Sequence, residues 1–121
     1  MAAKTKILIV DDDRELLSTL KRYLELQGIK VSGATSGEEA AEILDKESFD
    51  LVLLDIILPG INGIEILKNI KEKNPDQKVI VMTAMLSIEN TIAALREGAV
   101  EYLLKPFSSL EYIWTIIERY L

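Results

Sequence analysis

Apolar segments of strand length alternate along this chain with segments that carry apolar residues at helical spacing. Three short segments, ILIV at 7–10, LVLL at 51–54 and VIVM at 79–82, contain no polar residue. Such uninterrupted apolar runs are typical of strands that are buried on both faces of a sheet. Two further strands are predicted at 30–34 and 102–104, and the fewer apolar residues of 30–34 suit the edge of a sheet.

Five segments with helical periodicity lie between and after these strands. The first follows Asp12 or Asp13 as its cap, places four leucines on one face and ends at Gly28. Ser36 opens the second, with Glu39 at the capping-box position. An Asn-Pro pair ends the third. The predicted helices span 14–27, 36–46, 63–74, 87–97 and 108–121.

This alternation predicts an α/β fold. The connections are too long for hairpins, so the strands are expected to be parallel, with helices on both faces of the sheet. The expected architecture is (βα)5, a doubly wound five-stranded parallel sheet in the flavodoxin-like order 2-1-3-4-5. The 121 residues show no repeat, linker or low-complexity segment, and we expect a single domain over 1–121.

Composition and charge restrict the classes of function. With 49% hydrophobic and 28% charged residues, the chain has the profile of a folded soluble protein. No apolar run approaches the roughly 20 residues of a membrane span, and the first residues lead directly into a strand. We therefore expect a cytoplasmic protein without a signal peptide. The net charge of −6 argues against direct binding to nucleic acid.

The absence of cysteine and histidine narrows the chemistry further. Disulfides and thiolate zinc sites are excluded, and the commonest general base is missing. A metal ion would have to be a hard cation held by oxygen atoms, and Mg²⁺ is the expected one.

Polar side chains stand where four of the predicted strands end. Asp11 and Asp12 follow the first strand, Asp55 ends the third, Thr83 follows the fourth and Lys105 follows the fifth. Ligands of open α/β sheets bind beyond the carboxyl ends of the strands, so these side chains are expected to gather at one edge. Each residue alone also has a structural interpretation, as a helix cap, a turn residue, a strand threonine or a solvated lysine. Their joint placement favours a chemical site.

The charges of this set indicate what it would bind. Asp11, Asp12 and Asp55 bring three negative charges and Lys105 one positive charge, which leaves −2 in a small volume. A divalent cation would relieve the repulsion between the carboxylates. Asp55 could then act as a nucleophile toward phosphorus, while Lys105 and the Thr83 hydroxyl stabilise the oxygens of the transferred group.

Four stretches carry a family resemblance, with these spacings and in this order. They are ILIVDDD at 7–13, LVLLDIILPGINGIE at 51–65, VIVMTA at 79–84 and EYLLKPF at 101–107. Over its whole length the chain resembles the receiver domain of two-component response regulators, of the chemotaxis-regulator-like kind, which has the 2-1-3-4-5 strand order. The resemblance implies a signalling switch controlled by phosphorylation.

The resemblance also implies a role for each site residue. Asp55 would be the phosphoacceptor. Asp12 would ligate Mg²⁺ directly and Asp11 through a water, with Asp55 and the backbone carbonyl of Ile57 as further ligands.

Thr83 and Lys105 would contact the phosphoryl oxygens, and the peptide bond between Lys105 and Pro106 would be cis. Tyr102 would be the switch residue, turning inward as Thr83 moves toward the phosphate.

Two positions suggest how long the phosphate would last. Ile57 and Met85 stand two residues beyond the acceptor and two beyond the threonine, where such domains flank the path of the attacking water. Both are apolar and cannot orient a water molecule. We hypothesise slow hydrolysis of the acyl phosphate. Leu58 and Asn62 are milder departures, at positions where the family commonly has Met and Asp.

The partners follow from the same resemblance. With no histidine of its own, the chain needs a phosphoryl donor, either a sensor histidine kinase, a phosphotransfer protein or a small acyl phosphate. A kinase would dock on the first helix and the loop after the fifth strand. The last helix places Leu110, Ile113, Trp114, Ile117, Tyr120 and Leu121 on one face, with Tyr112 and Ile116 to the side.

That helical face has two interpretations, which the sequence does not separate. It is either a broad buried stripe, or part of a surface shared with the fourth helix and fifth strand. Such a surface would bind an effector domain or form a homodimer.

Three other functions remain as alternatives. A metal-dependent phosphatase would need an acid or base two residues after the acceptor, where Ile57 stands. A receiver-like scaffold that works without phosphorylation would not need the complete acidic set. A flavin carrier would need a phosphate-binding loop where this chain has Asp11, Asp12 and Asp13. We expect an autocatalytic phosphoacceptor that dephosphorylates itself, and not a turnover enzyme.

Overall fold

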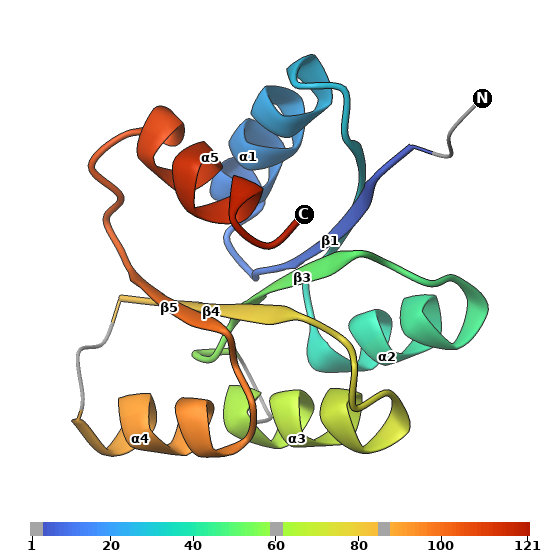
Figure 1. The fold of residues 1–121 in the computed structure, drawn as a ribbon, viewed down its shortest axis with the longest axis vertical. Helices are drawn as coiled ribbons and strands as arrows, with labels where there is room; N and C mark the ends of the chain where they lie inside the picture. The colour runs from blue at the N-terminus through green and yellow to red at the C-terminus, as the bar shows by residue number, and fades with distance from the viewer. Residues whose placement is uncertain (1–3, 59–61, 85–87) are drawn as a thin grey trace.

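The computed structural model describes residues 4–58, 62–84 and 88–121. Within these ranges strands and helices alternate as predicted (Figure 1). The elements are β1 (Lys6–Val10), α1 (Arg14–Leu26), β2 (Lys30–Ala34), α2 (Gly37–Lys46), β3 (Leu51–Asp55), α3 (Gly63–Lys73), β4 (Val79–Thr83), α4 (Ile88–Arg96), β5 (Glu101–Leu104) and α5 (Leu110–Glu118).

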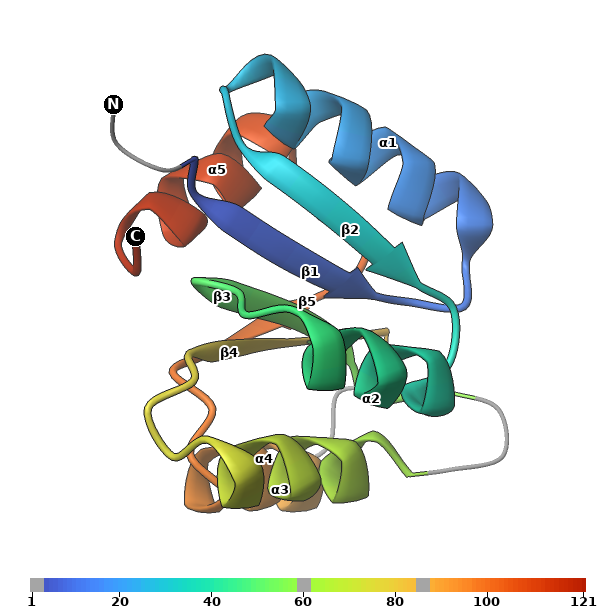
Figure 2. The same cartoon turned by 90° about the vertical axis from the view of Figure 1, so that its right-hand side faces the viewer.

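All five strands form one parallel sheet in the order β2-β1-β3-β4-β5. This confirms the predicted order and the position of β2 at an edge. Helices α1 and α5 cover one face of the sheet, and α2, α3 and α4 cover the other (Figures 1 and 2). Because both faces are covered, every residue of β3 and β4 is buried, which explains their uninterrupted apolar runs.

Alternate residues of the inner strands enter two separate core layers. Each fully buried Leu or Ile contributes roughly 1.5–3 kcal/mol relative to an exposed one, so the two layers supply most of the driving force for folding. The layer under α2, α3 and α4 includes Leu8, Val10, Val52, Leu54, Leu67, Ile70 and Val81. The layer under α1 and α5 includes Ile7, Ile9, Leu20, Leu24, Leu53, Ile80 and Ile117.

None of the helices in the described ranges is long and apolar enough to cross a membrane.

Local hydrogen bonds decide where the helices begin. Asp13, and not Asp12, caps α1, because its Oδ1 accepts the N–H groups of Glu15 and Leu16 at 3.1 Å each. Ser36 caps α2 as expected. In a capping box the Glu39 carboxylate would accept the N–H of Ser36. Here it accepts the N–H of Thr35 instead.

The prediction for the last helix was wrong at both ends. Ser109 is the N-cap and accepts the N–H of Tyr112 at 3.0 Å, so α5 begins after it, and the helix ends at Glu118. Ile116, which was placed to the side, is 4% exposed, because α5 packs against α1 as well as the sheet. Leu121 lies beyond the helix and is 44% exposed.

Helix α3 starts in direct contact with the residue that follows Asp55. The N–H of Gly63 donates to the carbonyl oxygen of Ile56 at 3.1 Å. A Cβ atom at position 63 would lie 2.1 Å from the Cα of Ile56 and 2.6 Å from its carbonyl oxygen. Only glycine permits this approach, so the missing side chain sets the distance between α3 and the end of β3.

We therefore predict that Gly63→Ala lowers the free energy of unfolding by about 3 kcal/mol, because backbone atoms must move apart. Gly33→Ala is the control: its Cβ would meet only side-chain atoms of Leu17, at 3.0–3.2 Å, which can shift. Its cost should stay below about 1 kcal/mol. Urea unfolding of the three proteins measures both values, and equal costs would contradict the role given to Gly63.

Candidate functional site

The polar residues expected at the strand ends do lie together at the carboxyl edge of the sheet. Asp11 directly follows β1 and is 0% exposed, Asp55 is 4% exposed and Thr83 is 0% exposed. The structure corrects one detail of the prediction. Thr83 is the last residue of β4 and does not follow it, since it pairs in register with Leu104, whereas Asp55 ends β3 as predicted and pairs with Met82.

Lys105 connects the two buried carboxylates. Its Nζ lies 2.6 Å from Oδ2 of Asp11 and 2.9 Å from Oδ2 of Asp55, and its side chain is only 14% exposed. Its backbone N–H donates to the carbonyl oxygen of Thr83 at 2.7 Å, which fixes it beside the end of β4. The peptide bond to Pro106 is cis, as the family resemblance implies. The lysine is thus the counter-ion of both buried aspartates.

Backbone N–H groups hold the second oxygen of each buried carboxylate. Oδ1 of Asp11 accepts the N–H of Asp13 at 2.9 Å, and Oδ1 of Asp55 accepts the N–H of Ile57 at 2.8 Å. These two donors were not predicted from the sequence. Their signal was present, because an Asp at the end of a strand commonly accepts the N–H group two residues further on.

Asp12 completes an acidic group that can hold a metal ion. One carboxylate oxygen each from Asp11, Asp12 and Asp55 lies within 4.8 Å of the others, and Asp12 is exposed while the other two are buried. Across the part of the chain that the structure describes, no other group of three such residues is found. Hard oxygen ligands with one side open to solvent fit a divalent cation.

Burial and the lysine act in opposite directions on the charges of this site. Burial raises the pKa of Asp11, although hydrogen bonds from Lys105 and from the N–H of Asp13 oppose the rise. Burial alone would lower the pKa of Lys105, but its hydrogen bonds to the two carboxylates outweigh that effect and raise it. The lysine therefore stays charged, while Asp11 takes up a proton more readily than a free carboxyl. Because a protonated Asp11 is a poorer ligand, cation binding should weaken as the pH falls.

The remaining predicted residues lie around this centre. The side chain of Ile57 is 43% exposed, and the residue forms a β-bridge with Asn62, the N-cap of α3. Tyr102 is half-buried in β5, pairs with Val81 and packs against the core layer under α2, α3 and α4. Met85 lies outside the described residues. The Ile57 carbonyl as a metal ligand and the switch role of Tyr102 stay predictions.

Fold and site together define a class of protein, an α/β domain with an aspartate–lysine cluster at the carboxyl edge of a 2-1-3-4-5 sheet. A model of the response regulator receiver domain matches residues 7–117. The chain therefore belongs to the response regulator receiver domain family, as the sequence resemblance indicated.

Individual proteins agree with this membership. The transcriptional regulatory protein CpxR of Escherichia coli strain K12 is 45% identical over 108 residues, which are 89% of this chain and 46% of CpxR. The response regulator SaeR of Staphylococcus aureus is 39% identical over 112 residues, or 93% of this chain and 49% of SaeR. The chain thus spans about half the length of the curated relatives it matches.

Among solved structures, a CheY-like receiver domain protein from Methanospirillum hungatei superposes with a TM-score of 0.90 at 35% identity, covering 97% of this chain and 94% of the other. The response regulator TrrA of Thermotoga maritima, solved in complex with Mg²⁺ and BeF, gives a TM-score of 0.86 at 32% identity. The superposition covers 97% of this chain and 99% of TrrA. The receiver fold is therefore shown by sequence and structure alike.

We predict that Lys105→Met binds a divalent cation about tenfold more tightly, since a hydrogen bond to a charged group contributes roughly 1.5 kcal/mol and the ammonium competes with the cation for the same oxygens. Lys68→Met removes one positive charge from an exposed lysine outside the site, and serves as the control. Calorimetric titration with MgCl₂ measures both. Unchanged or weaker binding by Lys105→Met would show that the lysine does not compete.

Proposed function

We propose that this receiver domain accepts a phosphoryl group on Asp55 with the help of Mg²⁺, from a sensor histidine kinase or phosphotransfer protein. The observation that carries the proposal is the position of Lys105 Nζ, within 2.9 Å of carboxylate oxygens of both Asp11 and Asp55, beside the third carboxylate of Asp12. In such a cluster, the ammonium of Lys105 and a cation held by the carboxylates would bind the negative oxygens of a phosphoryl group beside Asp55.

The residues that would hold the cation are all present. Asp11, Asp12 and Asp55 offer carboxylate oxygens, and the Ile57 carbonyl would add a backbone oxygen. When bound, Mg²⁺ would supply the positive charge that lowers the repulsion between Asp55 and an incoming phosphate. The complex of TrrA with Mg²⁺ and BeF supports the choice of this ion.

The chain's own side chains would carry out the transfer. An oxygen of Asp55 attacks phosphorus, the new O–P bond forms as the P–N bond of a phosphohistidine breaks, and the electron pair leaves with the imidazole. A small acyl phosphate would lose its P–O bond in the same way. Lys105, already 2.9 Å from Asp55, would neutralise an oxygen of the transferred group, and the Thr83 hydroxyl would bind another. The domain would thus be an autocatalytic phosphoacceptor.

A hollow beside Lys105 suits the approach of a donor protein. It has a volume of about 560 Å³ and lies between the start of α1 and the loop after β5, with Leu16, Pro106 and Phe107 in its wall. This is the surface predicted for kinase docking. We propose that the donor's histidine reaches Asp55 from this side.

The output surface would lie on α4, β5 and α5. Each of these elements exposes large apolar side chains, with Ile92 at 47%, Leu95 at 53%, Leu104 at 45% and Tyr112 at 47%. Movement of Thr83 toward the phosphate would let Tyr102, on β5, turn inward and change this surface. An effector domain or a second copy of the chain would bind there. The alternative of a scaffold without phosphorylation is not favoured, because the acidic cluster and Lys105 are fully assembled.

We expect incubation with acetyl phosphate and MgCl₂ to add the mass of one phosphoryl group, detected by intact mass spectrometry, and Asp55→Asn to abolish the adduct. Asp13→Asn is the matched control: the side chain of Asp13 caps α1, asparagine caps equally well, and the backbone N–H that binds Asp11 is unchanged. No adduct in the parent protein, or an adduct that persists in Asp55→Asn, would refute the proposal.

We further expect the phosphorylated protein to hydrolyse slowly, because the exposed apolar side chain of Ile57 stands beside Asp55 without a hydrogen bond to offer water. Ile57→Asn should speed autodephosphorylation by about tenfold, the effect of one added hydrogen bond to the attacking water. The decay of the phosphorylated mass after removal of acetyl phosphate gives the rate. An unchanged or slower decay in the variant would count against this role of Ile57.

A further inference from the structure

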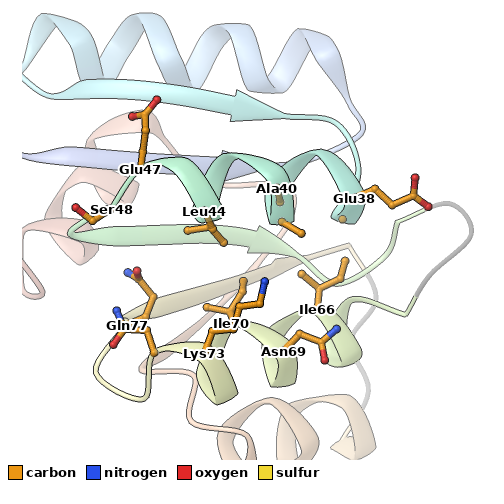
Figure 3. A pocket seen from close by; sticks show the side chains of 13 residues that line it. Glu38, Ala40, Leu44, Glu47, Ser48, Ile66, Asn69, Ile70, Lys73 and Gln77 are labelled. Carbon is orange, nitrogen blue, oxygen red and sulfur yellow. The ribbon is translucent and has the colours of Figure 1, made fainter.

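A cavity lies between α2 and α3, away from the aspartate–lysine cluster (Figure 3). Its volume is about 340 Å³, and none of the residues proposed for phosphoryl transfer lines it. Ala40 and Leu44 of α2 face Ile66 and Ile70 of α3 across it. A small-molecule site typically has about 300–1,000 Å³ and a mostly apolar wall, and this cavity meets both conditions.

One buried polar residue, Gln77, closes the end of the cavity near Ser48 (Figure 3). The side chain is held firmly, since its Nε2 donates to the carbonyl oxygens of Phe49 and Lys78 at 3.2 Å each. Its main chain is held too, because Lys71 Nζ donates to the Gln77 carbonyl oxygen at 2.8 Å. Gln77 as a whole is only 5% exposed. The amide is thus fixed in advance of any ligand.

The amide oxygen of Gln77 remains available as an acceptor. Among the described residues, no donor to Oε1 is found, and every fully buried side-chain oxygen or nitrogen has a partner. Oε1 therefore keeps some exposure, and Gln77 is one of the residues that line the cavity. A ligand with an O–H or N–H group would satisfy this oxygen, and such a bond adds specificity to an apolar site.

The charged groups at the rim do not favour an ionic ligand. Lys73 is paired with Asp45 at 2.9 Å, and Glu47 is paired with Lys6 at 2.9 Å. The carboxylate of Glu38 points away from the cavity, at the end opposite Gln77 (Figure 3). With its charges paired or turned outward, the cavity suits an uncharged molecule.

We propose that the cavity between α2 and α3 binds a small, uncharged, mainly apolar molecule of about two fused rings that donates one hydrogen bond to Oε1 of Gln77. This site is separate from the proposed phosphoacceptor chemistry and does not depend on it.

The test uses 2-naphthol as a probe and 2-methoxynaphthalene as its matched control, which has the same ring system but no donor. Amide resonances of the ¹⁵N-labelled protein are followed during titration. Shifts should be confined to α2, α3 and the segment around Gln77. The methyl ether should bind about threefold to tenfold more weakly, because it lacks the hydrogen bond.

Two variants test the position. Ala41→Leu narrows the cavity from α2 and Asn69→Leu narrows it from α3, and both positions are exposed, so the fold should persist. Each should weaken 2-naphthol binding at least tenfold. Glu42→Leu adds the same side chain to α2 outside the cavity and should leave binding unchanged.

Three results of the titrations would overturn the proposal. They are shifts centred on the apolar residues of α4, β5 and α5, equal affinity for the two naphthalenes, and binding that survives both narrowing variants. If the α2 and α3 resonances shift with protein concentration alone, the cavity is a self-association surface and the small-molecule assignment is wrong.

Discussion

The parallel pairing of the strands is the constraint on which the site depends. Because all five strands run the same way, their carboxyl ends meet at one edge, and side chains from distant parts of the chain converge there. The register is equally strict, since Asp55 pairs with Met82 and Thr83 with Leu104. A shift of one residue would turn each of these side chains to the opposite face of the sheet.

This convergence brings a buried negative charge that the fold must neutralise. Asp11 and Asp55 are almost fully removed from solvent, and an unpaired carboxylate in such a place would cost several kcal/mol. Lys105 offsets part of that cost but leaves an excess of negative charge once Asp12 is counted. The folded protein therefore carries uncompensated negative charge at this site. Divalent cation binding and phosphoryl transfer would both use this imbalance.

Most of the fold and the side chains of the site followed from the sequence, because buried strands have a recognisable pattern and their ends are easily located. The errors came where several residues compete for one role. Ser108 and Ser109 can both cap a helix, and only Ser109 does. Gln77 and the cavity beside α2 had no local signal, since they depend on the distance between two helices. Ile116 was misplaced for a related reason, because its burial depends on how α5 packs against α1 and the sheet.

The contacts of Lys105 also have a consequence for protein synthesis. Lys105 lies 94 residues after Asp11 and 50 residues after Asp55, so a ribosome makes the carboxylates long before the ammonium that joins them. A nascent chain that ends before β5 carries the acidic residues but not their counter-ion. Translation must therefore pass the last strand before the two buried carboxylates can meet their counter-ion.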